Sequence, residues 1–399
     1  MRAKSIHRRV LYASALVLTA SLALAAGFHA RSAYRFLGVF QEVWRLARAN
    51  YVEPVDEDAL LRGAYQGMLS SLDAGSGYLN PEQSALMRMT PGPASAGLEL
   101  LPSAGIPVVV RVKEGGPAAK AGLEIGDQIW RIGDKPTRQL PLPLLEQLLR
   151  GEAGTVLPLT VLDGSQFKRR QVEMTLAIDE SSGYQLELVS GPIIRLTLSE
   201  IARVDTDALR RELQSVLAER SQAPVVVDLR GVVGTQPEQV TRLAGVMIPG
   251  GPLLRLVPRE GRASEVSAPR QGTPLLTGRA VFALVDGTTA GVGEALAALL
   301  AEKIGARICG RSTYGLGAVP EIIPLEDGSS VMLTTHEIQT MAGRSWAADG
   351  LEPDKILASV GRPRTDDGSA DRLLEEALEW IRSGDRDASD EERAQRPAA

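Results

Sequence analysis

The sequence predicts a mixed α/β (α+β) protein made of several domains. From Tyr184 onwards, short apolar runs alternate with helical patterns, an order typical of a sheet covered by helices. Between about Ser95 and Ile178 the pattern changes to short strands with only brief helices between them. The residues before this segment show helical spacing alone. A chain of 399 residues can bury a core in each of two or three such domains.

The composition is that of an ordinary globular protein, with 44% hydrophobic and 23% charged residues. The net charge is −5 and arginines are scattered among acids, so the sequence predicts no nucleic-acid partner. Cys309 is the only cysteine, which excludes an intramolecular disulfide, and its apolar surroundings predict a buried, inert thiol. The only histidines are His7, His29 and His336, so we expect neither a metal nor another cofactor.

A targeting segment is predicted at residues 1–33. Basic residues precede an apolar run over 10–27, in an order that fits either a secretory signal peptide or an uncleaved membrane anchor. These basic residues are Arg2, Lys4, Arg8 and Arg9. Because positive charge stays on the cytoplasmic side, the rest of the chain is expected across the membrane. The predicted location is the cell envelope, periplasmic or extracytoplasmic, with the protein membrane-anchored or secreted.

Residues 34–93 are predicted to form a helical region. Apolar residues recur at helical spacing over 34–50, where the helix either packs on the chain's own body or serves as a homodimerisation arm. A second helix is predicted from Glu57 to Leu72. Turn-forming residues over 73–81 end it, and the Pro-Gly-Pro sequence at 91–93 indicates a linker.

Residues 94–179 are predicted to form one compact unit. Strands are expected at 106–112, 128–132, 156–162 and 170–178, and helices at 117–123 and 140–149. The unit contains the segment EGGPAAKAGLEIGDQIWRIGDKP, in which a short helix leads through a tight turn at Gly126-Asp127 into a strand.

This segment closely resembles the core motif of PDZ domains, GxPAxxAGLxxGDxIxxI. The resemblance implies a module that binds an extended peptide by strand addition beside a helix, with backbone amides capturing the chain terminus. The helix at 140–149 would form the far side of the groove. The residues implied for peptide binding are Ala96, Gly97, Leu98, Glu99 and Leu100. A domain that kept its fold and lost its ligand is the alternative, because Ala96 is less permissive than the glycine usual there.

Residues 180–360 are predicted to form an α/β core, and residues 361–399 a C-terminal tail with one helix at 371–382. Core strands are expected at 192–198, 224–229, 279–285, 306–310, 319–325 and 330–336. Core helices are expected at 205–220, 236–247 and 289–303. The end of the tail is charged and is predicted to be disordered.

The segment from Val281 to Val319 is the predicted catalytic centre of this core. An apolar strand ends at Asp286-Gly287, a helical pattern follows, and the pair Gly315 and Gly317 comes after the next strand. Enzymes place nucleophiles at such a turn from strand to helix, because the free amides at the start of the helix stabilise developing negative charge. From this pattern alone, we expect catalytic chemistry here.

Together these elements resemble the carboxyl-terminal processing peptidases, also called tail-specific proteases. These are envelope serine peptidases with a PDZ domain ahead of an α/β catalytic core. The resemblance runs over roughly residues 36–357. Besides the PDZ motif, it rests on YVEPVD at 51–56, GAYQGMLSSLD at 63–73, VVVDLRG at 225–231, PLEDGSSVMLTT at 324–335 and GRSWAADGLEPD at 343–354.

The resemblance implies that activity would need a serine, a lysine and a supporting glutamine. In this sequence those positions hold Gly291, Leu316 and Pro320, the second 25 residues after the first. Glycine carries no nucleophile, and leucine can neither accept nor donate a proton. The loop implied to supply oxyanion donors is altered as well, at residues 232–235. We therefore interpret the chain as a catalytically inactive pseudoprotease, and we expect Gly291→Ala to have only a slight effect on stability.

The alternative is a serine- or threonine-type endopeptidase that processes the C-termini of envelope proteins by an unusual route. Thr288 and Thr289 carry hydroxyl groups beside the missing serine, and His336 is a weak candidate for the base. For the inactive protein we expect as partners peptides or protein C-termini, an active paralogue of the same family, and the membrane through the N-terminal segment. An inert remnant without a partner is the third interpretation.

Overall fold

The computed structural model describes residues 36–164, 166–270, 272–359 and 371–383, which form two compact units that divide between Ala64 and Tyr65. The targeting segment predicted at 1–33 and the charged end after residue 383 lie outside the described residues. Within the described part of the chain, no helix is both long and apolar enough to span a membrane.

The first unit is helical, as predicted. Residues 36–50 form one helix, and α2 (Glu57–Ser70) begins in this unit and ends in the second. The first helix exposes large apolar side chains, of which Phe36 is 73% and Val43 is 60% exposed. Surface exposure of this kind on one helix leaves apolar area that another surface could cover.

The turn predicted at 73–81 contains a strand, and a helix that the sequence analysis missed follows it. Strand β1 (Gly77–Leu79) is fully buried, and α3 (Pro81–Arg88) starts two residues later. The missed signal is Asn80 followed by proline. Asn80 caps α3 by accepting a hydrogen bond from the Gln83 amide at 2.9 Å, and proline suits the first helical turn.

The segment predicted as a linker at 91–93 connects α3 to the next strand, with Pro91 and Pro93 exposed and Gly92 close to a neighbouring backbone. A Cβ atom added to Gly92 would lie 2.2 Å from the carbonyl oxygen of Gly151, so only glycine allows this approach of two backbones. The segment leads directly into β2 (Ala94–Ser95). In a small antiparallel sheet, β2 pairs with β7 (Arg150–Gly151) and with β10 (Ala177–Ile178).

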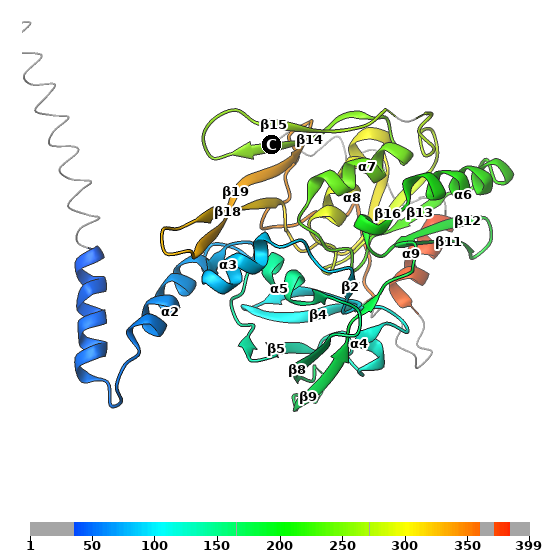
Figure 1. The fold of residues 1–399 in the computed structure, drawn as a ribbon. Helices are drawn as coiled ribbons and strands as arrows, with labels where there is room; N and C mark the ends of the chain where they lie inside the picture. The colour runs from blue at the N-terminus through cyan, green and yellow to red at the C-terminus, as the bar shows by residue number, and fades with distance from the viewer. Residues whose placement is uncertain (1–35, 165, 271, 360–370, 384–399) are drawn as a thin grey trace, which may run out of the picture. The chain divides into compact units, whose positions relative to one another are not determined.

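The segment predicted as a PDZ unit forms an antiparallel sheet in the order β3-β4-β5-β8-β9, with β6 paired to β5. Its strands are β3 (Leu98–Ser103), β4 (Ile106–Val112), β5 (Gln128–Ile132), β6 (Lys135–Pro136), β8 (Val156–Leu162) and β9 (Arg169–Thr175). The two helices, α4 (Pro117–Lys120) and α5 (Leu142–Leu148), lie where they were predicted. Strand β3 is at the edge of the sheet and α5 packs beside it. Figure 1 shows α5 close to the strands of this sheet.

The α/β core is built on a six-stranded sheet in the order β11-β12-β13-β16-β17-β20. Strands β11 (Tyr184–Val189) and β12 (Ile193–Leu198) are antiparallel, whereas β12 to β20 are all parallel. The parallel strands after β12 are β13 (Val225–Asp228), β16 (Val281–Val285), β17 (Arg307–Gly310) and β20 (Lys355–Ile356). Every residue of β13 is buried, which explains its continuous apolar run.

Helices cover both faces of this sheet, as Figure 1 shows. Val225 and Val227 of β13 point to the face covered by α6 (Thr206–Glu219), α7 (Pro237–Met247) and α8 (Val292–Ile304). Val226 points to the opposite face, where α9 (Arg372–Arg382) packs. Cys309 lies on this second face, and burial raises the pKa of its thiol to about 12, as expected for an inert cysteine.

A further antiparallel sheet packs against the core, in the order β1-β19-β14-β15 with β18 paired to β19. Strands β14 (Gly251–Pro258) and β15 (Ser264–Ala268) were not predicted, because glycine and proline at the ends of β14 resemble loop residues. Strand β18 (Ala318–Pro324) agrees with the prediction. Strand β19 (Ser330–Thr340) runs four residues beyond the predicted end at His336.

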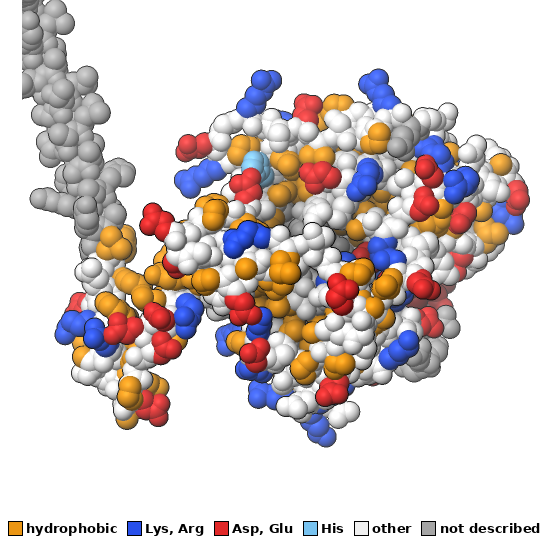
Figure 2. All heavy atoms as spheres, in the orientation of Figure 1, with side chains coloured by type: hydrophobic (Ala, Val, Ile, Leu, Met, Phe, Trp, Pro, Cys, Tyr) orange, Lys and Arg blue, Asp and Glu red, His pale blue; other side chains and the backbone are white. Residues whose placement is uncertain are grey.

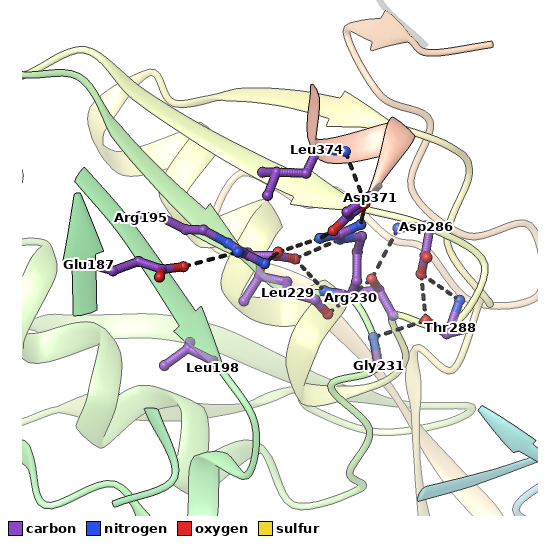
Figure 3. A network of polar contacts seen from close by, with 12 residues as sticks. Glu187, Arg195, Leu198, Leu229, Arg230, Gly231, Asp286, Thr288, Asp371 and Leu374 are labelled. Atoms are coloured by element: carbon purple, nitrogen blue, oxygen red, sulfur yellow. Dashed lines mark hydrogen bonds and ion pairs between the residues drawn. The ribbon is translucent and has the colours of Figure 1, made fainter. Parts of the chain in front are cut away.

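A buried polar network ties the C-terminal helix to the core sheet (Figure 3). The Arg230 guanidinium donates hydrogen bonds to Asp228 at 2.6 Å and to Asp371 at 2.7 Å. Arg195 donates to the same Oδ2 atom of Asp228 at 2.7 Å, and these cations hold the pKa of the Asp228 carboxyl well below its usual value although burial opposes this. Asp371 also caps α9 through the Leu374 amide at 3.1 Å.

We predict that Asp371→Ala lowers the free energy of unfolding by about 2 kcal/mol, because both the helix cap and one partner of Arg230 are lost. Asp371→Asn should lose less, since asparagine still caps the helix. Chemical denaturation measures both values. Glu379→Gln, on the exposed side of the same helix, is the matched control. Equal stability of Asp371→Ala and this control would contradict the assignment.

Candidate functional site

Gly291 stands at the turn from strand β16 to helix α8, where the predicted catalytic centre would place its nucleophile. It is the N-terminal cap of α8, with φ of 59° and ψ of −106°. This backbone region favours glycine strongly, and any other residue would be strained there. A Cβ atom at position 291 would lie 3.4 Å from Leu316 Cδ2, so the two positions implied for nucleophile and base are neighbours in space.

The carbonyl oxygen of Gly234 fills the space that a side chain at position 291 would need. A Cβ atom there would lie 1.8 Å from this oxygen, far inside contact distance. The same oxygen accepts a hydrogen bond from the Val292 amide at 3.0 Å, and the Val232 oxygen accepts one from the Ala290 amide at 2.9 Å. Amides at the start of α8 are therefore bonded to the chain's own backbone. An incoming oxyanion would have to displace these bonds.

Glu294 binds backbone amides on the other side of the same region. The sequence analysis did not identify it as a site residue. Its wholly buried carboxylate accepts hydrogen bonds from the amides of Gly291 and Leu316, both at 2.8 Å, and of Gly315 at 2.7 Å. The Thr313 hydroxyl donates a fourth. Burial raises the pKa of this carboxyl, although the four donors favour its charged form. A charged residue in the otherwise apolar first turns of the helix was the signal in the sequence.

Leu316, at the position implied for the base, is part of an apolar cluster. It is 7% exposed and packs with Ala290 of the core and with Leu101, Val110 and Leu142 of the antiparallel unit. Leucine here adds to the packing between the two parts, whereas a lysine would bring a charge into an apolar surrounding. Pro320 lies in β18 opposite Thr334 of β19, and its ring offers no hydrogen-bond donor.

The candidate hydroxyl and imidazole groups have structural partners. Thr288 donates to the Asp286 carboxylate at 2.5 Å and accepts from the Gly231 amide at 2.9 Å (Figure 3). Thr289 is fully buried and donates to the carbonyl oxygen of Leu229 at 3.1 Å. His336 lies in another sheet, where its Nδ1 is 2.9 Å from the Thr335 hydroxyl and 3.5 Å from Glu321. Within the described residues, His336 forms no hydrogen bond with Thr288 or Thr289.

The second feature of the site is a cavity of about 680 Å³ beside strand β3. Its walls come from the antiparallel unit and from the core, and they include all five residues implied for peptide binding. Those five are Ala96, Gly97, Leu98, Glu99 and Leu100. On the far side stand Pro143, Glu146 and Gln147 of α5, and the core contributes among others Val233 and Gly234. The cavity thus reaches the loop that blocks Gly291.

The start of β3 has the features of a terminus-binding loop. Gly97 has φ of 68°, and its amide donates to no other group among the described residues. Ala96 and Gly97 are held from behind, because their carbonyl oxygens accept from Ala118 and Lys113, both at 2.9 Å. Since β3 is an edge strand, it can accept an added strand on its open side. The assignment of peptide binding to these residues stays a prediction.

Two carboxyl groups in this cavity are held in an unfavourable environment. Burial, together with the nearby Glu146, raises the pKa of Glu99 to about 8. Burial raises the pKa of Glu146 to about 7, against the opposing effect of Arg150. Elsewhere on the face shown in Figure 2, acidic and basic side chains are interspersed. Among the described residues, no group of three or more potential metal ligands is placed to hold an ion.

The expectation that Gly291→Ala has only a slight effect on stability is wrong, because of the clash with the Gly234 oxygen. We predict a loss of about 3 kcal/mol in the free energy of unfolding. Gly305→Ala is the matched control, since Gly305 ends the same helix with φ of 70° and open space around it. It should lose only about 1 kcal/mol. Equal losses in thermal or chemical denaturation would show that position 291 is open.

Comparisons with known proteins agree with the two domains described above. Residues 193–357 match peptidase family S41, and residues 108–163 match the PDZ domain. A carboxy-terminal-processing protease of Bartonella bacilliformis is 27% identical over 360 residues, which cover 88% of this chain and 83% of that protein. A chloroplastic C-terminal processing peptidase of Tetradesmus obliquus is 26% identical, over 79% of this chain and 72% of its own length.

Among solved structures, the photosystem II D1 C-terminal processing protease superposes with a TM-score of 0.59 and 25% identity. The superposition covers 80% of this chain and 92% of that protein. The chain is therefore a homologue of the carboxy-terminal processing proteases, with a PDZ domain at 108–163 and a peptidase family S41 domain at 193–357.

Proposed function

We propose that this protein is a pseudoprotease of the cell envelope, which binds peptides or protein C-termini through its PDZ groove and does not hydrolyse them. It would act as a scaffold or adaptor. The observation that carries the proposal is the carbonyl oxygen of Gly234, 1.8 Å from the site of a Cβ atom at position 291. The reactive side chains are replaced. In addition, other groups of the chain occupy the space that a nucleophile would fill and bind the amides that would stabilise an oxyanion.

Three contacts support the proposal that the folded protein holds this site in an inactive arrangement. Glu294 bonds to amides from both loops of the site, so neither loop is free to present donors to a substrate. Leu316 contributes to the packing between the PDZ domain and the core. The Tyr314 hydroxyl donates to the carbonyl oxygen of Pro102 in the PDZ domain at 2.7 Å. Restoring a serine and a lysine would disrupt packing that the present residues make.

The peptide-binding half of the proposal rests on a groove whose parts are intact. Edge strand β3, the unbonded Gly97 amide and helix α5 surround the cavity together. The cavity of about 680 Å³ has a volume typical of ligand-binding pockets, which favours peptide binding over an inert remnant. Substrate-sized peptides can enter such a volume.

The remaining parts of the proposal concern location and partners. The basic and apolar segment at 1–33 supports export or anchoring in the envelope. An active paralogue would make a suitable partner, because it could cleave the peptides or protein C-termini that this chain binds. The apolar helix at residues 36–50, with Phe36 and Val43 exposed, is proposed as a homodimerisation arm.

Hydrolysis by a threonine is the competing function, and a defined experiment tests it. An unstructured protein such as casein is incubated with the purified full-length chain. Mass spectrometry should then detect no cleavage products. A fluorophosphonate probe should label no residue. Thr288→Val and Thr289→Val serve as controls, because valine keeps the shape and removes the hydroxyl. Cleavage that one of these variants abolishes would contradict the proposal.

The double variant Gly291→Ser with Leu316→Lys should remain inactive in the same assay, because the Gly234 oxygen still occupies the nucleophile's space. The rate should stay within error of the unchanged protein. Recovery of turnover would mean that the loop at 232–235 moves aside easily, and that missing side chains alone explain the inactivity.

A further inference from the structure

We infer that the groove beside β3 selects peptides that carry a lysine or arginine side chain near their C-terminus. This inference rests on the proposed peptide-binding function and names its ligand class. It follows from which charged side chains face the cavity and from how they are paired.

Acidic groups outnumber basic groups around the cavity. The titratable and charged residues that line it are Glu99, Arg111, Lys113, Glu114, Glu146, Arg150, Asp179, Tyr184 and Glu200. They come from the PDZ strands, from α5 and from the facing edge of the core. The Tyr184 hydroxyl stays neutral, because burial and the nearby Glu212 raise its pKa to about 12.

The basic side chains of the cavity already have partners. Lys113 pairs with Asp179, and Arg150 pairs with Glu200 at 2.9 Å. Arg111 donates to the carbonyl oxygens of Leu198 at 3.2 Å and Ser199 at 2.8 Å, which fixes it against the core. Lys113 and Arg150 are therefore paired with acids in the wall, whereas Arg111 keeps its charge near Glu99 and lowers the pKa of that carboxyl against the larger effect of burial. Five acids still face three bases around the cavity.

Of the acids that line the cavity, Glu99, Glu114 and Glu146 form no ion pair within the described residues, and Glu114 is exposed to solvent. Glu99 comes from the edge strand and Glu146 from the facing helix, the two sides between which an added strand would lie. Within the described residues, neither of these two carboxyl groups accepts a hydrogen bond or forms an ion pair. Burial, together with the nearby Glu146, raises the pKa of Glu99, so ionising both carboxyl groups brings repulsion between them. A cationic side chain between them would relieve this repulsion.

The geometry of an added peptide strand also fits this arrangement of carboxyl groups. In an added strand, alternate side chains point to the same side, so one residue in two can reach the carboxyl groups while the terminus occupies the loop at Gly97. An ammonium or guanidinium group on such a residue gains charge-assisted hydrogen bonds. A peptide with a glutamate at that place would add a third negative charge to the pair.

The selectivity should depend on pH, with a defined sign. A carboxyl group attracts a cation only when ionised, and the pKa values of Glu99 and Glu146 lie near 8 and 7 in the empty groove. Affinity for a basic peptide should therefore rise as pH increases from 6 to 8.5. A lysine side chain and a free C-terminus keep their charges over this range, so the change belongs to the groove.

The test uses the full-length chain and fluorescence anisotropy. Labelled, N-terminally blocked heptapeptides differ only at the third residue from the end, which is lysine, glutamine or glutamate, and a fourth peptide has lysine with an amidated C-terminus. We expect the lysine peptide to bind about tenfold more tightly than the glutamine peptide at pH 8. Glu146→Gln should remove most of this preference and its pH dependence. Glu152→Gln, an exposed acid outside the cavity, should leave both unchanged.

The outcomes separate the two proposals. If peptides with a free C-terminus bind equally well whatever their third residue, and Glu146→Gln changes nothing, the selectivity is refuted while peptide binding stands. If no peptide binds, or if amidated and free termini bind alike, the proposed terminus-binding function fails too. Preference for the glutamate peptide would also overturn the inference, since it would indicate a positive electrostatic potential in the cavity.

Discussion

The carbonyl oxygen of Gly234 is the atom on which this account depends. It accepts from the Val292 amide at the start of α8 and occupies the space beside Gly291. In a peptidase these amides and this space would have to be available to the substrate. Here the backbone of one loop satisfies the end of the helix, and Glu294 satisfies the amides of the other. The end of a helix always needs such partners, and this chain supplies them itself.

Position 316, which the resemblance implies for the base, contributes to the packing of the protein. A leucine there joins an apolar cluster shared by the PDZ domain and the core. Together with the Tyr314 and Arg111 hydrogen bonds to the facing part, this cluster holds the groove beside the core loops. Buried apolar area stabilises at about 25 cal/mol per Å², whereas a buried lysine would need a partner. The proposed peptide-binding groove thus adjoins the loops around Gly291.

The sequence predicted four of the five parallel strands and most helices, because buried runs such as Val225–Asp228 and the spacing of Leu209 and Leu213 leave little ambiguity. The two-residue strand β20 was not predicted. Prediction also failed where local signals conflict, as in β14, whose ends carry glycine and proline, and in α3, whose cap was taken for a turn. Residue identities were enough to place Gly291 and Leu316. They could not reveal the Gly234 oxygen or the environment of Glu99, because both arise from contacts between segments far apart in the sequence.

Amide hydrogen exchange tests the central claim most directly, because it asks whether the site is closed in solution. The amides of Gly291, Val292 and Leu316 should exchange slowly in the free full-length protein, at rates similar to those of buried strand amides. Addition of a C-terminal peptide should leave these rates unchanged and should slow exchange at Gly97. Fast exchange at Val292 and Leu316 in the free protein would contradict the account, since it would mean that these donors are open to solvent and to a substrate.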